Sequence, residues 1–363
     1  MAIRLGKNYP IRVGTGFATR VQSFAVNKGG QLEMSYEMGN SSPVGTDRAT
    51  VEYTGNLAWN PVDNLIENRF IGVTGATGTV TLNQLIGTTG VLLQSKTDGI
   101  NFAKITSLEY SCQVGGPFQA TAQVRGNGWN DGDPALAAST ITGAGDYKSK
   151  SIGVVVNGQR AVRVASFRLS AAVQPEDQYE MGNQDPFETT TETPSVNAEI
   201  EWWEDTLATG MMENESDAPH DIVIGVDGGK LLTMKNAVWQ DTGIRGSVRG
   251  AGTRRYSYMS KGDSSTDGFQ VSLNTAPTCT LTGSMTGASA VAGQFITLTA
   301  TASDTDGLYK VHFYRGTTKL GDDNTAPYAI GWTATAGTHV LSAKAEDIFG
   351  MKTASNSYTV TAA

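Results

Sequence analysis

Histidines and closely spaced acids are the side chains of this sequence that could do chemistry. The three histidines are His220, His312 and His339. His220 has no Ser or Cys nucleophile nearby, and the other two fall within or at the start of predicted strands, where a structural or surface role is typical. The sequence contains no G-x-S-x-G, P-loop or H-E-x-x-H motif. We therefore predict no catalytic residues and expect that the chain is not an enzyme.

Two acidic turns resemble parts of calcium loops. Asp304 and Asp306 precede Gly307, and a second acidic group surrounds two glycines and consists of Asn127, Asn130, Asp131 and Asp133. Neither turn has the full D-x-D-x-D-G spacing followed by a bidentate glutamate. Asp-Gly turns between strands are commoner than calcium sites, so we predict no metal and no cofactor. Whether the Asp304/Asp306 turn binds calcium stays open.

Composition and charge narrow the function classes. The chain has 363 residues, with 27 basic and 35 acidic side chains and a net charge of -8. That charge argues against a protein that grips duplex DNA, because neutralising phosphates needs surplus Lys and Arg. Cys112 and Cys279 have no paired spacing and are expected to be ordinary buried thiols. No signal-peptide pattern or long apolar run is present, so we expect synthesis in a cytoplasm and no membrane partner.

An internal repeat organises the first 272 residues. Residues 20–59 match residues 163–202 at an offset of 143, with 15 identities in 40 positions. Unrelated sequences of ordinary composition would give only about two or three. A second echo, residues 124–128 against 248–252, has an offset of 124 and suggests that the second copy lacks about 19 residues. We predict domains at 1–150, 151–272 and 275–363.

Each copy is predicted to be mostly strands with one polar and one apolar face, because apolar residues alternate with polar ones. A helix is expected after each Trp, with Asn60 as N-cap and Pro61 at its first position in the first copy, and a weaker helix at 203–207 in the second. Later strands are predicted at 105–111, 118–125, 221–226, 231–239 and 244–249. The polar-face positions singled out are Ser23, Asn27, Thr54, Asn56, Ser166, Ser170, Asn197, Glu199 and Glu201.

Charge is unevenly spread over the second copy. Residues 176–217 contain 13 acids and no Lys or Arg. A solvated acidic loop is one interpretation, and an acid-lined sheet surface that includes Glu199 and Glu201 is another. Arg245 and Arg249, followed by Arg254 and Arg255, suggest a basic edge elsewhere in the copy. Opposite charges on separate edges would suit head-to-tail self-assembly as well as a ligand site.

The last ninety residues have a different pattern. Short alternating runs are separated by turns about every ten residues, at 295–302, 308–314, 329–336, 339–346 and 357–360. This spacing predicts a β-sandwich. The segment that begins GQFITLTATASDTDGLYKVHFYRG resembles bacterial Ig-like domains over nearly its whole length.

The duplicated segment VASFRLSAAVQPEDQYEMGNQDPFE…VNAEIEWWEDT, with its earlier copy, resembles the tail tube proteins of long-tailed (siphovirus-type) bacteriophages. It is most similar to the variety with two tube folds per chain. The resemblance covers about residues 1–272. It implies a curved β-sheet or barrel with a helix and a long loop in each copy, and no catalysis or cofactor. It also implies that six folds close a ring, so three chains complete each ring, and that stacked rings form a hollow tail.

The sequence therefore predicts a mainly β structural virion protein: a major tail tube subunit that forms homotrimeric rings, with an Ig-like domain outside. The nine polar-face residues are predicted to face the lumen, and phage DNA is expected to pass without specific binding. The expected partners are further copies of the chain and the tape-measure and tail-end proteins, and the expected location is the phage tail. The alternative is a secreted or surface glycan-binding module with an Ig-like accessory domain, for which Trp202 and Trp203 offer a platform.

Overall fold

The computed structural model shows two compact units built almost entirely of strands. The repeat unit comprises residues 1–150, 156–223 and 230–273, and the Ig-like unit comprises residues 151–155, 224–229 and 274–363. The residues that the structure describes are 10–18, 20–30, 32–35, 45–48, 50–61, 64–71, 79–81, 84–85, 90–136, 149, 152–181, 183–191, 194–203, 218–226, 229–247, 250–261, 268–285 and 287–363. The predicted mainly β fold class is confirmed.

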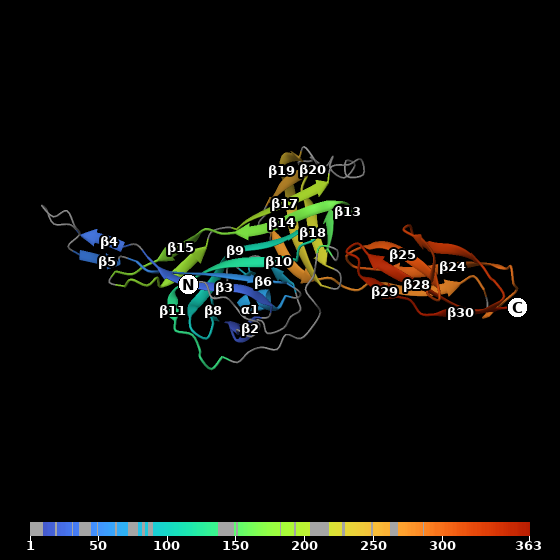
Figure 1. Cartoon of the computed structure of the whole chain (residues 1–363), viewed down its shortest axis with the longest axis horizontal. Helices are drawn as coiled ribbons and strands as arrows, with labels where there is room; N and C mark the ends of the chain where they lie inside the picture. The colour runs from blue at the N-terminus through green and yellow to red at the C-terminus, as the bar shows by residue number, and fades with distance from the viewer. Residues whose placement is uncertain are drawn as a thin grey trace. The chain divides into compact units, whose positions relative to one another are not determined.

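One antiparallel sheet runs through both copies of the repeat (Figure 1). Its neighbouring strands are, in order, β3 (Val21–Gly29), β6 (Glu52–Trp59), β10 (Gln119–Gly126), β9 (Gly99–Gln113), β14 (Val164–Ala172), β17 (Ser195–Trp203), β20 (Gly250–Ser260) and β19 (Lys230–Ser247). The first four strands belong to the first copy and the last four, in the same order, to the second. The copies meet where β9 pairs with β14. The sheet does not close into a barrel, which the resemblance had left as an alternative to an open curved sheet.

The first two strands of each copy share their irregularities at the predicted offset of 143. In both copies the register contains a β-bulge, with Gln22 as the extra residue on β3 and Ala165 on β14. Before each bulge lies an arginine with a left-handed backbone, Arg20 at φ 59° and Arg163 at φ 60°. A left-handed non-glycine residue costs about 1–3 kcal/mol, so its recurrence marks a retained backbone feature of the repeat.

The other two strands of each copy correspond at an offset of 134. Val124 lies opposite Gly55 and Tyr258 lies opposite Ala198. Because Gly55 and Ala198 are themselves 143 apart, Val124 and Tyr258 are equivalent. The predicted echo of 124–128 with 248–252 was therefore wrong, and the second copy is shorter by 143 − 134 = 9 residues rather than 19. Residues 248–249 lie outside the described residues.

The bulge between these strands also recurs at the offset of 134. The extra residue is Thr106 on β9 and Gln240 on β19. Left-handed residues recur as well, with Phe102 at φ 51° and Asn236 at φ 50°. Bulges bend a strand and increase its twist, so the two halves of the sheet share the same local curvature. The two predicted strands at 231–239 and 244–249 are parts of the single strand β19.

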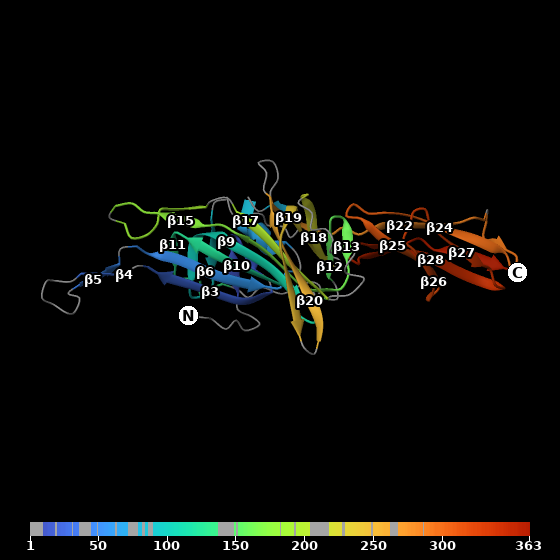
Figure 2. The same cartoon turned by 90° about the horizontal axis from the view of Figure 1, so that it is seen from above.

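A hairpin is inserted between the first two strands of each copy, at the place of the predicted long loop. It is formed by β4 (Leu32–Ser35) and β5 (Gly45–Arg48) in the first copy. In the second copy it is formed by β15 (Pro175–Gln178) and β16 (Glu188–Thr191). The registers again match at 143. Both hairpins extend beyond the same end of the sheet (Figures 1 and 2).

The helix α1 (Leu65–Phe70) packs against the buried face of the sheet. The expected helix after Trp59 exists, but its N-cap is Asn64 rather than Asn60. Its Glu67 accepts hydrogen bonds from Tyr110 of β9 and from the buried Lys230 of β19, at 2.5 Å for the lysine. The helix of the first copy is thus tied to a strand of the second. The predicted helix at 203–207 lies mostly outside the described residues, and Trp203 ends β17.

Shorter strands complete the fold. They are β1 (Ile11–Val13), β2 (Gly16–Ala18), β7 (Val80–Thr81), β8 (Val91–Gln94), β11 (Gly128–Asn130), β12 (Ile152–Val156), β13 (Gln159–Ala161), β18 (His220–Val226) and β21 (Phe269–Leu273).

The Ig-like unit is a β-sandwich of two sheets, as predicted. One sheet contains β22 (Thr278–Gly283), β24 (Phe295–Ser303) and β27 (Tyr328–Thr333). The other contains β23 (Ser289–Ala290), β30 (Tyr358–Ala362), β28 (Gly337–Asp347), β25 (Leu308–Arg315), β26 (Thr318–Asp323) and β29 (Lys352–Ala354). Leu298 and Trp332 of the first sheet share a core with Phe313 and Leu341 of the second. All five predicted strands are present, whereas β22, β23, β26 and β29 were not predicted.

Candidate functional site: the polar face of the repeat unit

All nine polar positions singled out from the sequence lie on one face of the sheet. Asn27 is directly opposite Thr54, and Ser166 is directly opposite Glu201. Directly opposed residues of antiparallel strands project to the same side. The registers extend this surface, which we call the polar face, through Ser107, Glu109, Ser111, Thr121, Gln123, Arg125, Arg168, Arg255 and Ser257. The face is continuous across the junction of the two copies.

Strict alternation separates this face from the core. On β10, Ala120, Ala122 and Val124 are buried, whereas Gln119, Thr121 and Gln123 are exposed. On β17, Ala198 and Ile200 are buried between partly exposed polar residues. Side chains two apart on a strand share a face, so the sequence pattern alone directs the polar groups outward.

The polar face is charge-balanced, which differs from the acid-lined surface considered from the sequence. Arg168 binds Glu109 at 2.7 Å, and Arg255 lies 3.4 Å from Glu199. The hydrogen bond and charge of Glu109 raise the pKa of Arg168, so this guanidinium stays charged and occupied. The Arg168–Glu109 pair joins β14 to β9 across the junction of the copies.

The proposed separation of charge onto different edges was wrong where the structure can test it. Strand β20 pairs directly with β17, so Arg255 is opposite Glu201 within the sheet. Glu201 accepts hydrogen bonds from Ser166 at 3.0 Å and Thr253 at 2.5 Å. The side chain of Arg245 and all of Arg249 lie outside what the structure describes. Sequence position alone could not reveal that β17 and β20 are neighbours.

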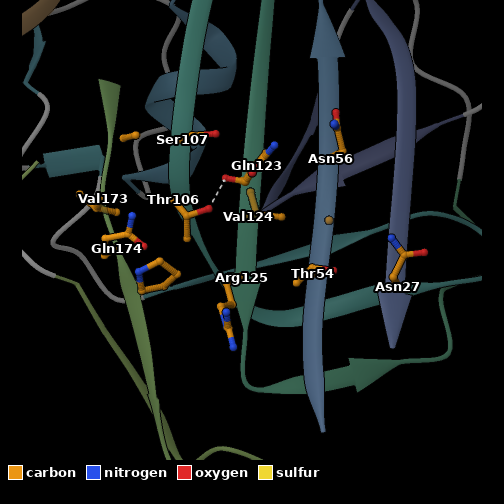
Figure 3. Close-up of a pocket in the computed structure, with 13 residues that line it drawn as sticks. Asn27, Thr54, Asn56, Thr106, Ser107, Gln123, Val124, Arg125, Val173 and Gln174 are labelled. Atoms are coloured by element: carbon orange, nitrogen blue, oxygen red, sulfur yellow. Dashed lines mark hydrogen bonds between the residues drawn. The ribbon is translucent and has the colours of Figure 1, made fainter. Parts of the chain in front are cut away.

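A hollow of about 560 Å³ opens on the polar face of the first copy (Figure 3). Asn27, Thr54 and Asn56 from the predicted set line it. Its other lining residues are Gly55, Thr106, Ser107, Gln123, Val124, Arg125, Ala172, Val173, Gln174 and Pro175. It lies beside the bulge at Thr106, whose hydroxyl donates to the carbonyl of Gln123 at 3.3 Å. The remaining six predicted residues occur elsewhere on the face, in the second copy or at Ser23.

Arg125 holds the second-copy hairpin against the first-copy sheet. Its guanidinium lies 2.6 Å from Asp177 of β15 and 3.1 Å from Glu52 of β6. Burial opposes the charge of Arg125, but the hydrogen bond and charge of Asp177 outweigh it and raise the arginine pKa. The hairpin is also fixed by Tyr53, whose hydroxyl donates to Asp185 at 2.6 Å. The amide of Val51 donates to the carbonyl of Gln184 at 2.8 Å.

Arg125, Gln123 and Ser107 also belong to the polar face, although they were not among the nine predicted positions. The signal was present for Gln123 and Arg125, because they alternate with Ala122 and Val124 in a predicted strand. Val173 and Gln174, which lie between β14 and β15, also line the hollow, but no alternating pattern in the sequence indicates this. That segment reaches the hollow only because β14 pairs with β9.

The histidines occupy structural positions in the described part of the chain. His312 is buried between two carboxylates, with Nδ1 2.7 Å from Asp322 and Nε2 2.6 Å from Glu346. His339 Nε2 bonds the carbonyl of Thr335 at 2.8 Å. Within the residues the structure describes, no three or more His, Cys, Asp or Glu side chains are grouped to hold a metal ion.

The two thiols are free and buried, as predicted. Burial raises the pKa of Cys112 to about 11, which keeps this thiol protonated and unreactive at neutral pH. Among the described helices, none has the length and apolar character needed to span a bilayer. Trp202 is only 4% exposed, against 40% for Trp203, so these two rings do not form one exposed platform for a sugar.

Comparisons with known proteins identify the C-terminal domain. A family model described as a bacterial Ig domain matches residues 277–343. A solved structure of fibronectin(III)-like modules of CbhA from Clostridium thermocellum is 31% identical, covering 23% of this chain and 94% of that chain, with a TM-score of 0.23. The search of curated proteins found no match. The C-terminal domain is therefore Ig-like, and the resemblance of residues 1–272 to tail tube proteins stays a prediction.

Proposed function

We propose that this protein is a structural subunit of a phage tail tube. Copies join through the edges of the repeat unit into rings that stack around a conduit for DNA, and the Ig-like domain is an accessory module. Three chains with two repeats each would supply the six folds of a ring. In this role the chain is not an enzyme and needs no cofactor. Its partners would be further copies of itself and the tape-measure and tail-end proteins of the virion.

The junction between β9 and β14 is the observation that carries this proposal. Here the last strand of one copy pairs with the first strand of the next over seven residues, from Ser166 opposite Gln113 to Ala172 opposite Ser107. In the described part of the chain, β3 pairs with β6 alone, and residues 237–247 of β19 pair with β20 alone. The free edge of β19 is equivalent to that of β9, and the free edge of β3 is equivalent to that of β14. The two ends of the sheet are therefore complementary halves of the β9–β14 junction. Unpaired edges favour association with further strands.

The repeat offsets specify the register of a junction between chains. Residues 166–172 correspond to 23–29, and residues 107–113 correspond to 241–247. Repeating the internal register places Gly29 opposite Asp241 of a second copy and Ser23 opposite its Ser247. Because the two edges differ, the contact is heterologous, and it forms a closed ring or an open fibre according to the rotation between subunits.

The hairpins support the same arrangement. The β15–β16 hairpin of the second copy binds the first-copy sheet through Asp177 and Arg125. At the equivalent positions, Met34 replaces Asp177 and Met259 replaces Arg125. Met259 is 43% exposed, which leaves an apolar side chain on the surface. The β4–β5 hairpin of another chain could therefore bind there through a methionine contact, where the internal hairpin uses an ion pair.

The chemistry of the polar face suits passage of DNA. Its arginines bind Glu109, Glu199 and Asp177, so their charge is neutralised within the protein and is not free to hold phosphates. Most of the remaining side chains are small and uncharged. Such a surface is hydrated but does not bind a polyanion tightly. Passage of DNA in this proposal therefore rests on a neutral polar lumen rather than on an acidic one.

Electron microscopy of the purified full chain over a range of concentrations tests the proposal. We expect rings, and tubes built from stacked rings, as concentration rises. Rings with a threefold repeat of the Ig-like domain would support the proposed stoichiometry. A monodisperse monomer at all concentrations, measured in parallel by light scattering, would contradict the self-assembly.

A further inference from the structure

We propose that the Ig-like unit binds a calcium ion through the side-chain oxygens of Asn274 and Asp304, beside the carboxylates of Asp306 and Asp347. The four residues come from three segments: the chain before β22, the turn after β24 and the end of β28. The amide of Ile348 donates to the carbonyl of Gly307 at 3.0 Å, which joins the second and third segments.

Asn274 supplies a buried oxygen without a partner. The residue is 8% exposed, and its Nδ2 donates to Asp347 Oδ2 at 2.8 Å. This bond holds the carboxamide against the carboxylate. Its Oδ1 is buried and accepts no hydrogen bond. Leaving a buried acceptor unpaired costs about 1–3 kcal/mol, so this oxygen calls for a ligand.

Asp304 presents a second oxygen of the same kind. Its Oδ1 accepts the amides of Asp306 at 2.8 Å and Gly307 at 3.0 Å, which fixes the turn. Its Oδ2 is buried and has no partner. Burial, followed by the charges of Asp306 and Asp347, raises the pKa of Asp304. The turn thus holds a carboxylate oxygen in a negative and partly dehydrated environment.

Asp347 brings a fully buried charge to this place. It is 0% exposed, and its Oδ1 accepts the amides of Phe349 at 2.9 Å and Met351 at 2.7 Å. Asp306 adds a further carboxylate, which accepts a hydrogen bond from the Thr275 hydroxyl at 3.2 Å. Three acids and one amide therefore meet where the chain enters the sandwich.

In the described part of the chain these acids have no basic partner, in contrast to the buried Glu346. Glu346 is bound to His312 at 2.6 Å and lies 3.5 Å from Lys352. Among the described residues, no Lys, Arg or His forms an ion pair with Asp304, Asp306 or Asp347. Buried carboxylates are ordinarily paired or bound to a metal, so a cation is the ligand that this group fits.

The donor atoms select calcium among common metal ions. All of them are carboxylate or carboxamide oxygens, which hard cations prefer. Calcium accepts six to eight such ligands in irregular geometry, whereas magnesium requires a near-ideal octahedron. The three carboxylates do not form a metal cage by themselves. The site depends on the carboxamide oxygen of Asn274, which a search for acidic clusters does not include.

Isothermal titration of the full chain with calcium chloride, after treatment with EDTA and dialysis, tests the proposal. We expect about one calcium per chain, magnesium affinity at least about tenfold weaker, and a higher unfolding temperature of the Ig-like unit with calcium than with EDTA. No binding by the folded wild-type chain at millimolar calcium would overturn the proposal, whatever the variants do.

Two isosteric variants localise the ion. Asp304→Asn keeps an oxygen for the turn but removes the charge, and it should lower calcium affinity at least about tenfold. Asp323→Asn is the matched control, because Asp323 also accepts backbone amides, from Thr325 and Ala329, in the same unit. It should bind as the wild type does. If Asp304→Asn does not fold, as judged by circular dichroism, Asp306→Asn takes its place. Wild-type affinity in a folded Asp304→Asn or Asp306→Asn variant would overturn the proposed ligand set.

Discussion

The two copies of the repeat share their backbone and differ in what they contact. Both have a bulge in the first strand pair, a bulge in the second pair, two left-handed residues and an extended hairpin. Within the chain, however, the first copy meets its neighbour at β9 and ends at β3, whereas the second copy meets its neighbour at β14 and ends at β19. The hairpin contact that is an ion pair in the first copy has methionines at the equivalent positions of the second. The free edges at β3 and β19 are the reason why we propose the internal β9–β14 junction as the template for a junction between chains.

The largest expected effect concerns the bond that ties the copies together. Lys230→Met leaves Glu67 buried without its cation and should reduce the free energy of unfolding by about 3–5 kcal/mol. Lys235→Met is the control, since its pair with Asp221 is half-exposed and should contribute less than about 1 kcal/mol. Urea unfolding followed by tryptophan fluorescence measures both. Equal, small effects would mean that the two copies are stabilised independently.

A second variant tests the ion pair that distinguishes the copies. Arg125→Met removes charged hydrogen bonds to Asp177 and should destabilise the repeat unit by about 1.5–3 kcal/mol. The equivalent exchange in the second copy, Met259→Arg, changes an exposed residue and should stay within about 0.5 kcal/mol. Hydrogen exchange should show faster exchange of the Val51 amide, which donates to Gln184, only in Arg125→Met. Similar behaviour of the two variants would contradict a different role for the two positions.

A third variant tests the proposed contact between the exposed Met259 and the β4–β5 hairpin of another chain. Met259→Asp should raise the concentration needed for ring formation by about tenfold or more, because a carboxylate would be buried in the methionine contact. Met181→Asp is the control, as Met181 is fully exposed at the tip of the internal hairpin. Sedimentation velocity measures assembly in both. Unchanged assembly of Met259→Asp would exclude this contact.

The smallest expected effect is the change of the unfolding temperature of the Ig-like unit with pH. This unit, unlike the repeat unit, has a buried histidine, His312, bound by two acids. Bonds from His312 and charges of nearby lysines outweigh burial and lower the pKa of Glu346. Lys319 and His312 likewise lower that of Asp322. A lowered carboxyl pKa stabilises the folded state above the unfolded pKa and is lost as pH falls through the folded value.

The unfolding temperature of the Ig-like unit should therefore fall as the pH drops below the ordinary carboxyl range near about 4. The raised pKa of Asp304 acts in the opposite direction, so the net slope is modest. Glu346→Gln should flatten it further. A slope that steepened in Glu346→Gln, measured by differential scanning calorimetry, would contradict this assignment.

Local alternation was enough to predict which residues share the polar face. Ser23, Asn27, Ser166 and Glu199 alternate with buried residues, and the sheet keeps that alternation. Pairing over long distances was not predictable in this way. Nothing in the local pattern brings Arg255 beside Glu199, and the chance likeness of 124–128 to 248–252 gave the wrong offset.

The hollow and the two unpartnered oxygens could not be predicted from the sequence, because each forms where segments far apart in the chain meet. The hollow beside Thr106 requires the β9–β14 pairing, and the buried oxygens of Asn274 and Asp304 require two loops of the sandwich to meet. The Asp304/Asp306 turn was visible in the sequence, but the amide that completes the proposed site is 30 residues earlier. Whether a side-chain oxygen is buried without a hydrogen-bond partner depends on three-dimensional packing, so no sequence motif could indicate it.

Disulfide trapping of the double variant Asn27→Cys/Gly243→Cys tests the central claim most directly. The repeated register places these two positions opposite each other in neighbouring chains, within the span of a disulfide. Mild oxidation should give covalent dimers and trimers on a non-reducing gel, and no larger species if the ring closes with three chains. The matched pair Lys28→Cys/Gly243→Cys is out of register by one residue and projects to opposite faces, so it should remain monomeric. Equal cross-linking of both pairs, or of neither while rings form, would contradict the proposed junction.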